Sequence, residues 1–349
     1  MISHLLGDCR QLLKTLDDAC VDCVVTSPPY FGLRDYGVAG QIGSEDSPEE
    51  HVRVMVELFR DVRRVLKKTG TVWMNYGDSY WNGGGVKTDN GHDFVDGGQR
   101  KLQKAKGSTL QKKTTASWNL KPKDMIGMPW RVAFALQADG WYLRQDIIWH
   151  KLNPMPESVT DRCTKSHEYV FLLTKSPTYF FDGEAIREQA VTFENRPSGV
   201  ERERTFGYES KTKMEGYNPK KKYIPSGWDT SKGGHRKKTG RYQNAEKVQA
   251  RAEPDHAVRD TRNKRSVWSL SSQPFTGAHF AVFPPELIRP CIVAGCPRGG
   301  IVLDPFGGSG TTALVAEQEG RDAILMELNP EYSELAKART SQSSLFSPQ

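Results

Sequence analysis

The segment Thr26-Ser27-Pro28-Pro29-Tyr30 carries side chains that could do chemistry on a ring with an amino group. It follows an apolar run, 21–25, that predicts a short buried strand. Two consecutive prolines cannot continue a strand or a helix, so the backbone must leave the sheet edge rigidly there. The Ser27 hydroxyl and the Pro28 carbonyl can accept hydrogen bonds from an amine, and the Tyr30 ring offers an aromatic face beside them. These groups suit a planar heterocycle with an exocyclic amine.

A second motif, 301–312, predicts a strand, a tight glycine turn and a helix that runs to about Gly320. Glycines at such a turn let the backbone approach a ligand closely. The spacing is not G-x-G-x-x-G and no Lys follows, so a phosphate-binding loop is not indicated. A further strand, 323–326, ends at Glu327, where a Rossmann-type site holds ribose hydroxyls. The motif predicts a cofactor site, with a nucleotide-binding or purely structural turn as the alternatives.

The elements that must position these motifs alternate between strands and helices. Strands are predicted at 2–6, 21–25, 71–75, 142–149, 167–174, 178–181 (in a hairpin with the previous one), 301–304 and 323–326, and helices at about 9–16, 47–70, 126–137, 286–294 and 311–320. This order predicts an α/β fold with a mostly parallel sheet covered on both faces. Because ligands bind such sheets at the carboxyl ends of strands, the two motifs can meet at one edge.

Length and composition agree with a cytoplasmic enzyme. The 349 residues can bury one large core with a smaller satellite. No run of about 18 apolar residues and no basic-then-apolar start is present, which predicts a soluble protein with no membrane partner. The six scattered cysteines suggest reduced thiols. Cys20-x-x-Cys23 could form a zinc site with Cys291 and Cys296, but Cys23 falls inside an apolar strand, so no metal is predicted.

Positive charge is concentrated in two segments that contain glycine and show little of the apolar spacing of helices or strands. Residues 187–265 hold 20 Lys/Arg against 11 Asp/Glu, and residues 81–125 hold 9 against 4, whereas the whole chain has a net charge of +7. The rest of the chain is therefore acidic. Basic segments interleaved with aromatic residues suit phosphate contact and base stacking, which favours nucleic acid for 187–265. For 81–125 a solvated loop explains the charge equally well.

Together the two motifs resemble the amino-methylating DNA methyltransferases. The family's catalytic loop reads Asp/Asn/Ser-Pro-Pro-aromatic, and its S-adenosylmethionine site reads Phe-x-Gly-x-Gly, which Phe306, Gly308 and Gly310 match. The catalytic motif comes first and the cofactor motif last, which resembles the circularly permuted β-group. The resemblance implies a Rossmann-like methyltransferase fold with a mixed, mostly parallel sheet, circularly permuted and interrupted by basic inserts.

The resemblance also implies site residues and partners. The implied catalytic residues are Ser27, Pro28, Pro29 and Tyr30, and the implied S-adenosyl-L-methionine site comprises Asp8, His279, Phe283, Pro284, Asp304, Pro305, Phe306, Gly308, Gly310, Thr311 and Glu327. Double-stranded DNA is the implied partner, with the target base flipped out of the duplex because its amine is otherwise paired. A homodimer and a separately acting restriction endonuclease are left open.

In the resembling family, Ser before the prolines goes mostly with cytosine N4 and Asp mostly with adenine N6. Cytosine N4 is therefore the predicted target, with adenine N6 as the alternative. Ring-carbon methylation would need a nucleophilic cysteine; Pro290-Cys291 occurs, but at apolar positions of a predicted helix, which indicates core packing. An RNA or protein methyltransferase and a non-enzymatic DNA-binding protein are more remote alternatives.

The predicted organisation follows the motifs. Residues 1–80 form the catalytic half, 81–125 a basic insert, 126–186 the continuation of the methyltransferase domain, 187–265 a basic insert and target-recognition region, 266–340 the cofactor-binding half and 341–349 a tail.

Overall fold

The computed structural model describes residues 1–33, 37–38, 40–81, 120–190, 261–272 and 283–344. The chain divides into two compact units, one of Met1–Arg187 with Asn263–Gln349 and the other of Glu188–Arg262. In the second unit the described residues form a two-stranded antiparallel ladder of β6 (Glu188–Gln189) and β7 (Thr261–Arg262). The predicted basic inserts lie mostly outside the described residues.

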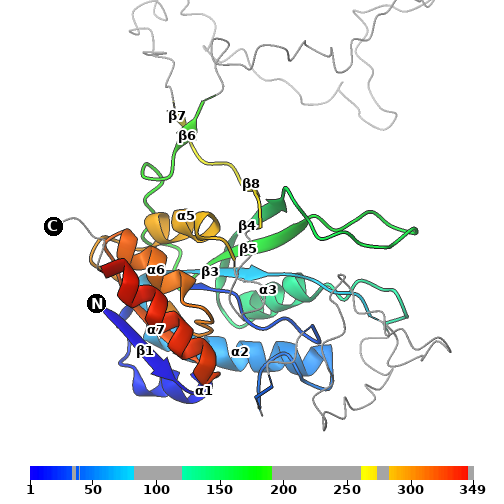
Figure 1. The fold of residues 1–349 in the computed structure, drawn as a ribbon, viewed down its shortest axis with the longest axis horizontal. Coiled ribbons are helices and arrows are strands. Elements are labelled where there is room, and N and C mark those ends of the chain that lie inside the picture. Colours follow the sequence, from blue (N-terminus) through cyan, green and yellow to red (C-terminus); the bar gives the residue numbers. More distant parts are fainter. Residues whose placement is uncertain (34–36, 39, 82–119, 191–260, 273–282, 345–349) are drawn as a thin grey trace, which may run out of the picture. The chain divides into compact units, whose positions relative to one another are not determined.

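The first unit is built on an eight-stranded sheet with the order β1-β10-β9-β2-β3-β5-β4-β8 (Figure 1). Its strands are β1 (Ile2–Leu6), β2 (Val21–Thr26), β3 (Leu66–Tyr76), β4 (Tyr142–Lys151), β5 (His167–Thr174), β8 (Val267–Leu270), β9 (Ile301–Asp304) and β10 (Asp322–Glu327). Within this sheet β5 runs antiparallel to β3 and β4, and the other described pairs are parallel. The prediction of an α/β fold with a mixed, mostly parallel sheet is confirmed.

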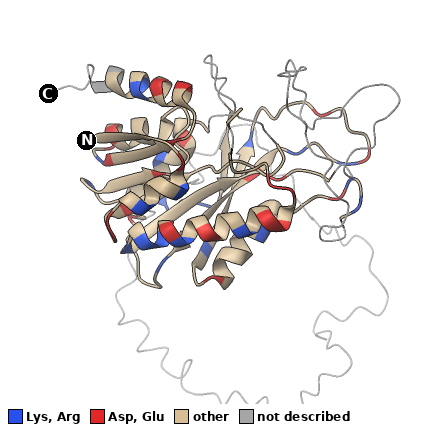
Figure 2. Ribbon diagram, turned by 90° about the horizontal axis from the view of Figure 1, so that it is seen from below, with Lys and Arg blue, Asp and Glu red and all other residues tan. Residues whose placement is uncertain are grey.

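Helices cover both faces of this sheet. They are α1 (Cys9–Leu12, followed by a 3-10 turn at Leu13–Thr15), α2 (Pro48–Val65), α3 (Met128–Ala138), α5 (Pro285–Gly295), α6 (Thr311–Gln318) and α7 (Pro330–Ser344). The start of α2 follows from its sequence: the Ser47 hydroxyl accepts from the Glu50 N–H, and Pro48 occupies the first position. Charged residues line the outer side of this long helix, in the foreground of Figure 2. Among them, Arg53 forms an ion pair with Glu57, four residues further on.

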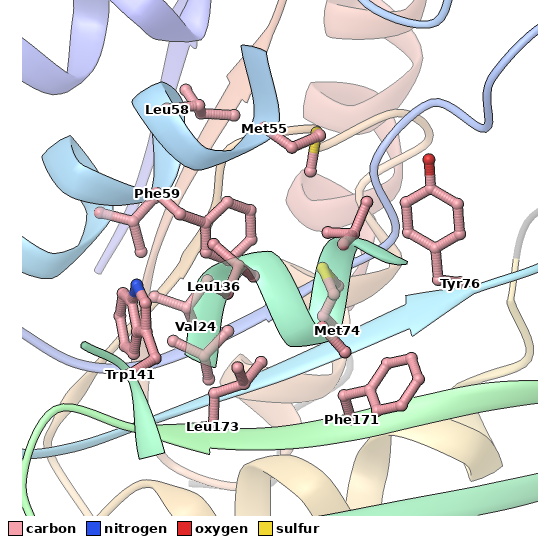
Figure 3. Packing of buried hydrophobic residues seen from close by; sticks show 14 of the residues in the cluster. Val24, Met55, Leu58, Phe59, Met74, Tyr76, Leu136, Trp141, Phe171 and Leu173 are labelled. Atoms are coloured by element: carbon pink, nitrogen blue, oxygen red, sulfur yellow. The ribbon is translucent and has the colours of Figure 1, made fainter. Parts of the chain in front are cut away.

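The alternation of side chains along β2 and β3 builds two cores. Val24 and Met74 lie in a cluster with α2 and α3 residues such as Phe59 and Leu136 (Figure 3). Cys23 and Trp73 point the other way, into a cluster with α5 and α6. β2 and the later part of β3 (70–76) are buried on both faces, and each contains a continuous apolar run, 23–25 in β2 and 72–74 in β3.

Two of the predicted elements are wrong in extent or kind. The predicted helix from Ser47 to Gly70 ends at Val65, because the backbone of Leu66 is extended and pairs with Val21 in the sheet. The predicted strand at 178–181 does not form; apart from one bond from the Phe180 N–H to the Thr69 carbonyl, the segment joins no ladder. The antiparallel partners of β5 are β3 and β4 instead.

Over the described ranges, no helix is long and apolar enough to cross a membrane. The same residues contain no group of three or more His, Cys, Asp or Glu side chains placed to hold a metal ion. Cys291 lies buried in α5, where its thiol contacts the Leu287 carbonyl, so it belongs to the core.

Candidate active site

A cavity of about 750 Å³ opens at the carboxyl ends of β2, β9 and β10. Its walls include twelve of the predicted site residues, namely Asp8, Ser27, Pro28, Pro29, Tyr30, Phe283, Asp304, Pro305, Phe306, Gly308, Thr311 and Glu327. The sheet order explains this meeting, because β2 pairs directly with β9 and places the Pro-Pro loop beside the glycine turn. Pro284 and Gly310 are not in the cavity wall, and His279 lies outside the described residues.

The buried carboxylate of Asp304 joins the two motifs. It accepts from the Thr26 hydroxyl at 2.6 Å, the Thr312 hydroxyl at 2.7 Å and the Phe306 N–H at 3.0 Å. Burial raises the pKa of Asp304 to about 6, against these hydrogen bonds, which favour its ionised form. The side chain is thus committed to holding the end of β2 against the turn after β9.

Glu327, at the end of β10, shapes the glycine turn from the other side. Its carboxylate accepts from the Gly308 N–H at 2.7 Å and from the Asn329 N–H at 2.8 Å. Burial raises the pKa of Glu327 even though the backbone bonds from Asn329, Gly308 and Leu328 favour the ionised form. A carboxylate has about four acceptor positions, so these backbone donors leave capacity for a hydroxyl group of a ligand in the cavity.

The glycine turn is also fixed from behind by α7, an element that the sequence did not predict. Gly310 has φ +81°, and a Cβ there would lie 2.9 Å from the Ala336 Cβ, so the position needs glycine for both its backbone and this close packing. The Arg339 guanidinium donates to the Ser309 carbonyl at 2.6 Å and to the Ser309 hydroxyl at 2.7 Å. Gly310 therefore supports the turn through its packing and does not line the cavity. Pro284, which is also outside the cavity wall, is the N-cap residue of α5.

Asp8 lines the cavity where β1 ends. It caps α1 by accepting from the Arg10 N–H at 2.9 Å, and it forms an ion pair with the Arg10 guanidinium. Burial tends to raise the pKa of Asp8, but the bonds from Arg10 hold it below its ordinary value. Arg10 also donates to the Gly40 carbonyl at 2.7 Å, which ties the loop after Tyr30 to this end of the cavity.

Tyr30, also in the cavity wall, is held by its hydroxyl. This hydroxyl donates to the Glu168 carboxylate at 2.9 Å and lies 3.2 Å from the Asn75 side-chain carbonyl. It also accepts from the Ser27 hydroxyl at 3.3 Å. The two side chains of the Pro-Pro loop that could act on a base are thus in one hydrogen-bonded chain that ends on a carboxylate.

Lys151 balances the charge of that carboxylate. It donates to Glu168 from the end of β4 and lies over the Trp149 ring, 4.7 Å from its centroid. Burial tends to raise the pKa of Glu168, but the charge of Lys151 and the bonds from Lys151, Tyr30 and Asn75 hold it below its ordinary value. Glu168 is therefore ionised at neutral pH.

The ring of Tyr30 rests on Tyr76, with centroids 4.9 Å apart and planes at 24°. Tyr76 is held in turn by His51 of α2, whose Nε2 lies 2.6 Å from the Tyr76 hydroxyl and whose Nδ1 lies 2.7 Å from Glu45. Gly77 makes room for the stack, since a Cβ there would lie 2.6 Å from the Tyr30 Cε2. One face of the Tyr30 ring is therefore covered.

Sequence reasoning did not place Asn75, Lys151 or Glu168 among the site residues. Glu168 lies at the start of its strand. In a parallel sheet the strands start at the edge opposite to the carboxyl ends where ligands bind. Because β5 is antiparallel to both neighbours, its start lies beside the ends of β3 and β4. A prediction of that reversal would have drawn Glu168 into the site, together with its ion-pair partner Lys151.

The doubly wound sheet, the glycine turn beside Glu327 and the Pro-Pro-Tyr loop in the same cavity define a Rossmann-like methyltransferase. Residues 21–338 match the N6_N4_Mtase family, described as DNA methylase. The chain belongs to this family of DNA methyltransferases.

Similar proteins align over nearly the whole chain. The type II methyltransferase M.SmaI of Serratia marcescens is 42% identical over 335 residues, which cover 96% of this chain and 89% of that protein. The type II methyltransferase M.Cfr9I of Citrobacter freundii is 40% identical over 333 residues, covering 95% of this chain and 85% of that protein.

Solved structures share the fold. PvuII DNA methyltransferase (cytosine-N4-specific) aligns with a TM-score of 0.56 and 17% identity, covering 97% of this chain and 86% of that one. A DNA modification methylase of Thermus thermophilus, complexed with S-adenosyl-L-methionine, aligns with a TM-score of 0.51 and 21% identity, covering 98% and 95%.

Proposed function

We propose that this chain transfers a methyl group from S-adenosyl-L-methionine to the exocyclic N4 amine of a flipped cytosine in double-stranded DNA. The observation that carries the proposal is that one cavity is lined both by Ser27 and Pro28 and by Asp304 and Gly308 of the glycine turn. A base amine and a methyl donor can be held there together, which supplies the proximity that such a transfer needs.

The wall formed by Glu327, Gly308 and Phe306 fits the donor. The Glu327 carboxylate would accept from a ribose hydroxyl with the acceptor capacity that its backbone bonds leave. Asp8 would lie near the adenine, and Phe283 would pack on it. When bound, S-adenosyl-L-methionine supplies an electrophilic methyl group on a positively charged sulfur.

The Pro-Pro loop would prepare the amine. An exocyclic amine conjugated with its ring has a poorly nucleophilic lone pair. If the Ser27 hydroxyl and the Pro28 carbonyl accept both amine hydrogens, the nitrogen becomes tetrahedral and its lone pair points at the methyl carbon. The face of the Tyr30 ring away from Tyr76 would stack on the base.

Cytosine is proposed because Ser27 stands before the prolines and because a cytosine-N4-specific enzyme shares the fold. Adenine N6 is the second candidate, since the matched family covers both bases. The relatives are type II methyltransferases, which supports a role in restriction-modification beside a separate endonuclease. The proposal further includes a circularly permuted order and a target-recognition region at 187–265.

Labelled methyl transfer tests this function directly. Purified protein is incubated with labelled S-adenosyl-L-methionine and duplex DNA, and the digested DNA is separated into nucleosides. Label in N4-methylcytosine is expected. Label only in N6-methyladenine would replace the proposed base but keep the enzyme class.

A further inference from the structure

A chain of hydrogen bonds leads away from the proposed amine-binding group, Ser27, to a charged acid. The Ser27 hydroxyl donates to the Tyr30 hydroxyl at 3.3 Å, and the Tyr30 hydroxyl donates to Glu168 Oε2 at 2.9 Å. The first distance is long for an O–H···O bond, but catalytic hydrogen bonds of ligand-free sites often shorten when substrate binds. Each donor in this chain points away from the cavity's amine site and toward the carboxylate.

The geometry points to Tyr30 and Glu168 as a proton relay that orients Ser27 as an acceptor and removes the amine proton after methyl transfer. This inference rests on the proposed function and applies to either base. Because the Ser27 hydrogen is engaged by Tyr30, the oxygen lone pairs remain for the base amine.

The relay balances every atom and charge. The base nitrogen bonds to the methyl carbon while the carbon–sulfur bond breaks, with its electron pair remaining on sulfur. The methylated nitrogen then carries one positive charge and an extra proton. That proton passes to the Ser27 oxygen, the Ser27 proton passes to Tyr30, and the Tyr30 proton passes to Glu168, which becomes neutral. Glu168 finally releases the proton to water, and the neutral methylated base leaves.

Glu168 is equipped to accept this proton for a moment and then lose it. Lys151 and Asn75 donate to the same carboxylate, so it is ionised before the reaction. A weakly basic carboxylate is sufficient, because the methylated, positively charged amine is a strong acid. Losing its proton restores the conjugation of the nitrogen with the ring. Without the relay, the proton would need a water molecule inside a cavity occupied by base and cofactor.

A purely structural account explains less of this geometry. The stack on Tyr76 and the room left by Gly77 already place the Tyr30 ring. The hydroxyl of Tyr30 adds nothing to a stacking surface, and a phenylalanine would fill the same space. The structural account therefore predicts that removing this hydroxyl leaves transfer almost unchanged.

Single-turnover kinetics of Tyr30→Phe, Glu168→Gln and the double variant separate the two accounts. We expect each single variant to transfer methyl at least about tenfold more slowly, because Ser27 is then no longer held as an acceptor that turns the amine lone pair toward the methyl carbon. The affinity for S-adenosyl-L-methionine and the KM for DNA should be unchanged. The double variant should be no slower than the slower single variant, because both changes interrupt one path. Tyr179→Phe and Glu334→Gln, which lie outside the cavity, are the matched controls.

The possible failures are distinguishable. If Tyr30→Phe kept more than half of the wild-type rate, or if the two losses multiplied in the double variant, the relay would be overturned while the proposed function stood. Tyr30→Phe decides the question even if Glu168→Gln leaves Lys151 unpaired and fails to fold. If the wild-type chain methylated neither base, the relay and the proposed function would be overturned together.

Discussion

The Thr26 hydroxyl donates to Asp304 Oδ1 at 2.6 Å, although 278 residues separate the two in sequence. Thr26 is the last residue of the strand before the Pro-Pro loop, and Asp304 is the last residue of the strand before the glycine turn. The proposed base site and the proposed cofactor site are therefore fixed to each other by one buried bond, in addition to the ladder between β2 and β9.

The raised pKa of Asp304 predicts a pH-dependent stability. Its folded-state pKa of about 6 lies above the ordinary value, so its contribution is fully present at low pH and is lost as the pH rises through about 6. Relative to Asp304→Asn, the free energy of unfolding of the wild type should rise by about 1 kcal/mol between pH 7 and pH 5. Urea unfolding at both pH values measures this, and a flat or falling difference would contradict it.

Ser27→Ala should slow methyl transfer by about 10²- to 10³-fold, because it removes one of the two acceptors proposed for the amine. The affinity for S-adenosyl-L-methionine should remain unchanged, since no proposed donor contact involves Ser27. Calorimetry and single-turnover kinetics test the two parts, with the exposed Ser341→Ala as the control. Near-normal turnover of Ser27→Ala would show that the orientation mechanism is wrong.

Glu327→Ala should weaken the binding of S-adenosyl-L-methionine by about 10- to 100-fold, because hydrogen bonds to a charged group are worth about 1.5–3 kcal/mol each. The change also removes the acceptor of the Gly308 N–H, which loosens the turn. Calorimetric titration measures the effect against Glu334→Ala, whose carboxylate lies on the exposed side of α7. Unchanged affinity in Glu327→Ala would exclude this carboxylate as a cofactor ligand.

Gly77→Ala should slow transfer at least about tenfold without unfolding the protein. The added Cβ would lie 2.6 Å from the Tyr30 Cε2, so the ring must move from its stack on Tyr76, and overpacking of this kind costs about 1–3 kcal/mol. Gly183→Ala is the matched control, because its new Cβ meets the exposed Phe181 ring at 3.2 Å. Equal transfer rates for the two variants would show that the Tyr30 position does not matter.

His51→Ala should lower the free energy of unfolding by about 3 kcal/mol. It removes the bonds to Glu45 and Tyr76 from a fully buried site and leaves a cavity. Tyr76→Phe removes only the second bond and should cost about 1 kcal/mol. Urea unfolding of both variants gives the comparison, and the expectation fails if Tyr76→Phe is the more destabilised.

The sequence predicted the parallel part of the fold well, because β2 and β9 are apolar runs that end in chain-breaking residues. It overextended α2, since Val65, Leu66 and the residues up to Gly70 continue an acceptable helical pattern. Only the pairing of Leu66 with Val21 makes them a strand, and that pairing is a tertiary contact.

The same limit applies to the site. Ser27, Asp304 and Glu327 could be found because each directly follows or ends a predicted strand. Lys151, Glu168 and Arg339 contribute through the direction of β5 and the packing of α7, which no local pattern expresses.

The chain leaves the first unit at Arg187 and returns to it at Asn263, and the Arg187 guanidinium donates to the Asn263 side chain at 3.0 Å. The β6–β7 ladder then closes the base of the second unit. Both ends of the inserted segment are therefore held together where it leaves and re-enters the first unit. The segment between Arg187 and Asn263 can thus be exchanged or lengthened as a unit during evolution, and a relative's segment can be grafted between the same two residues by design.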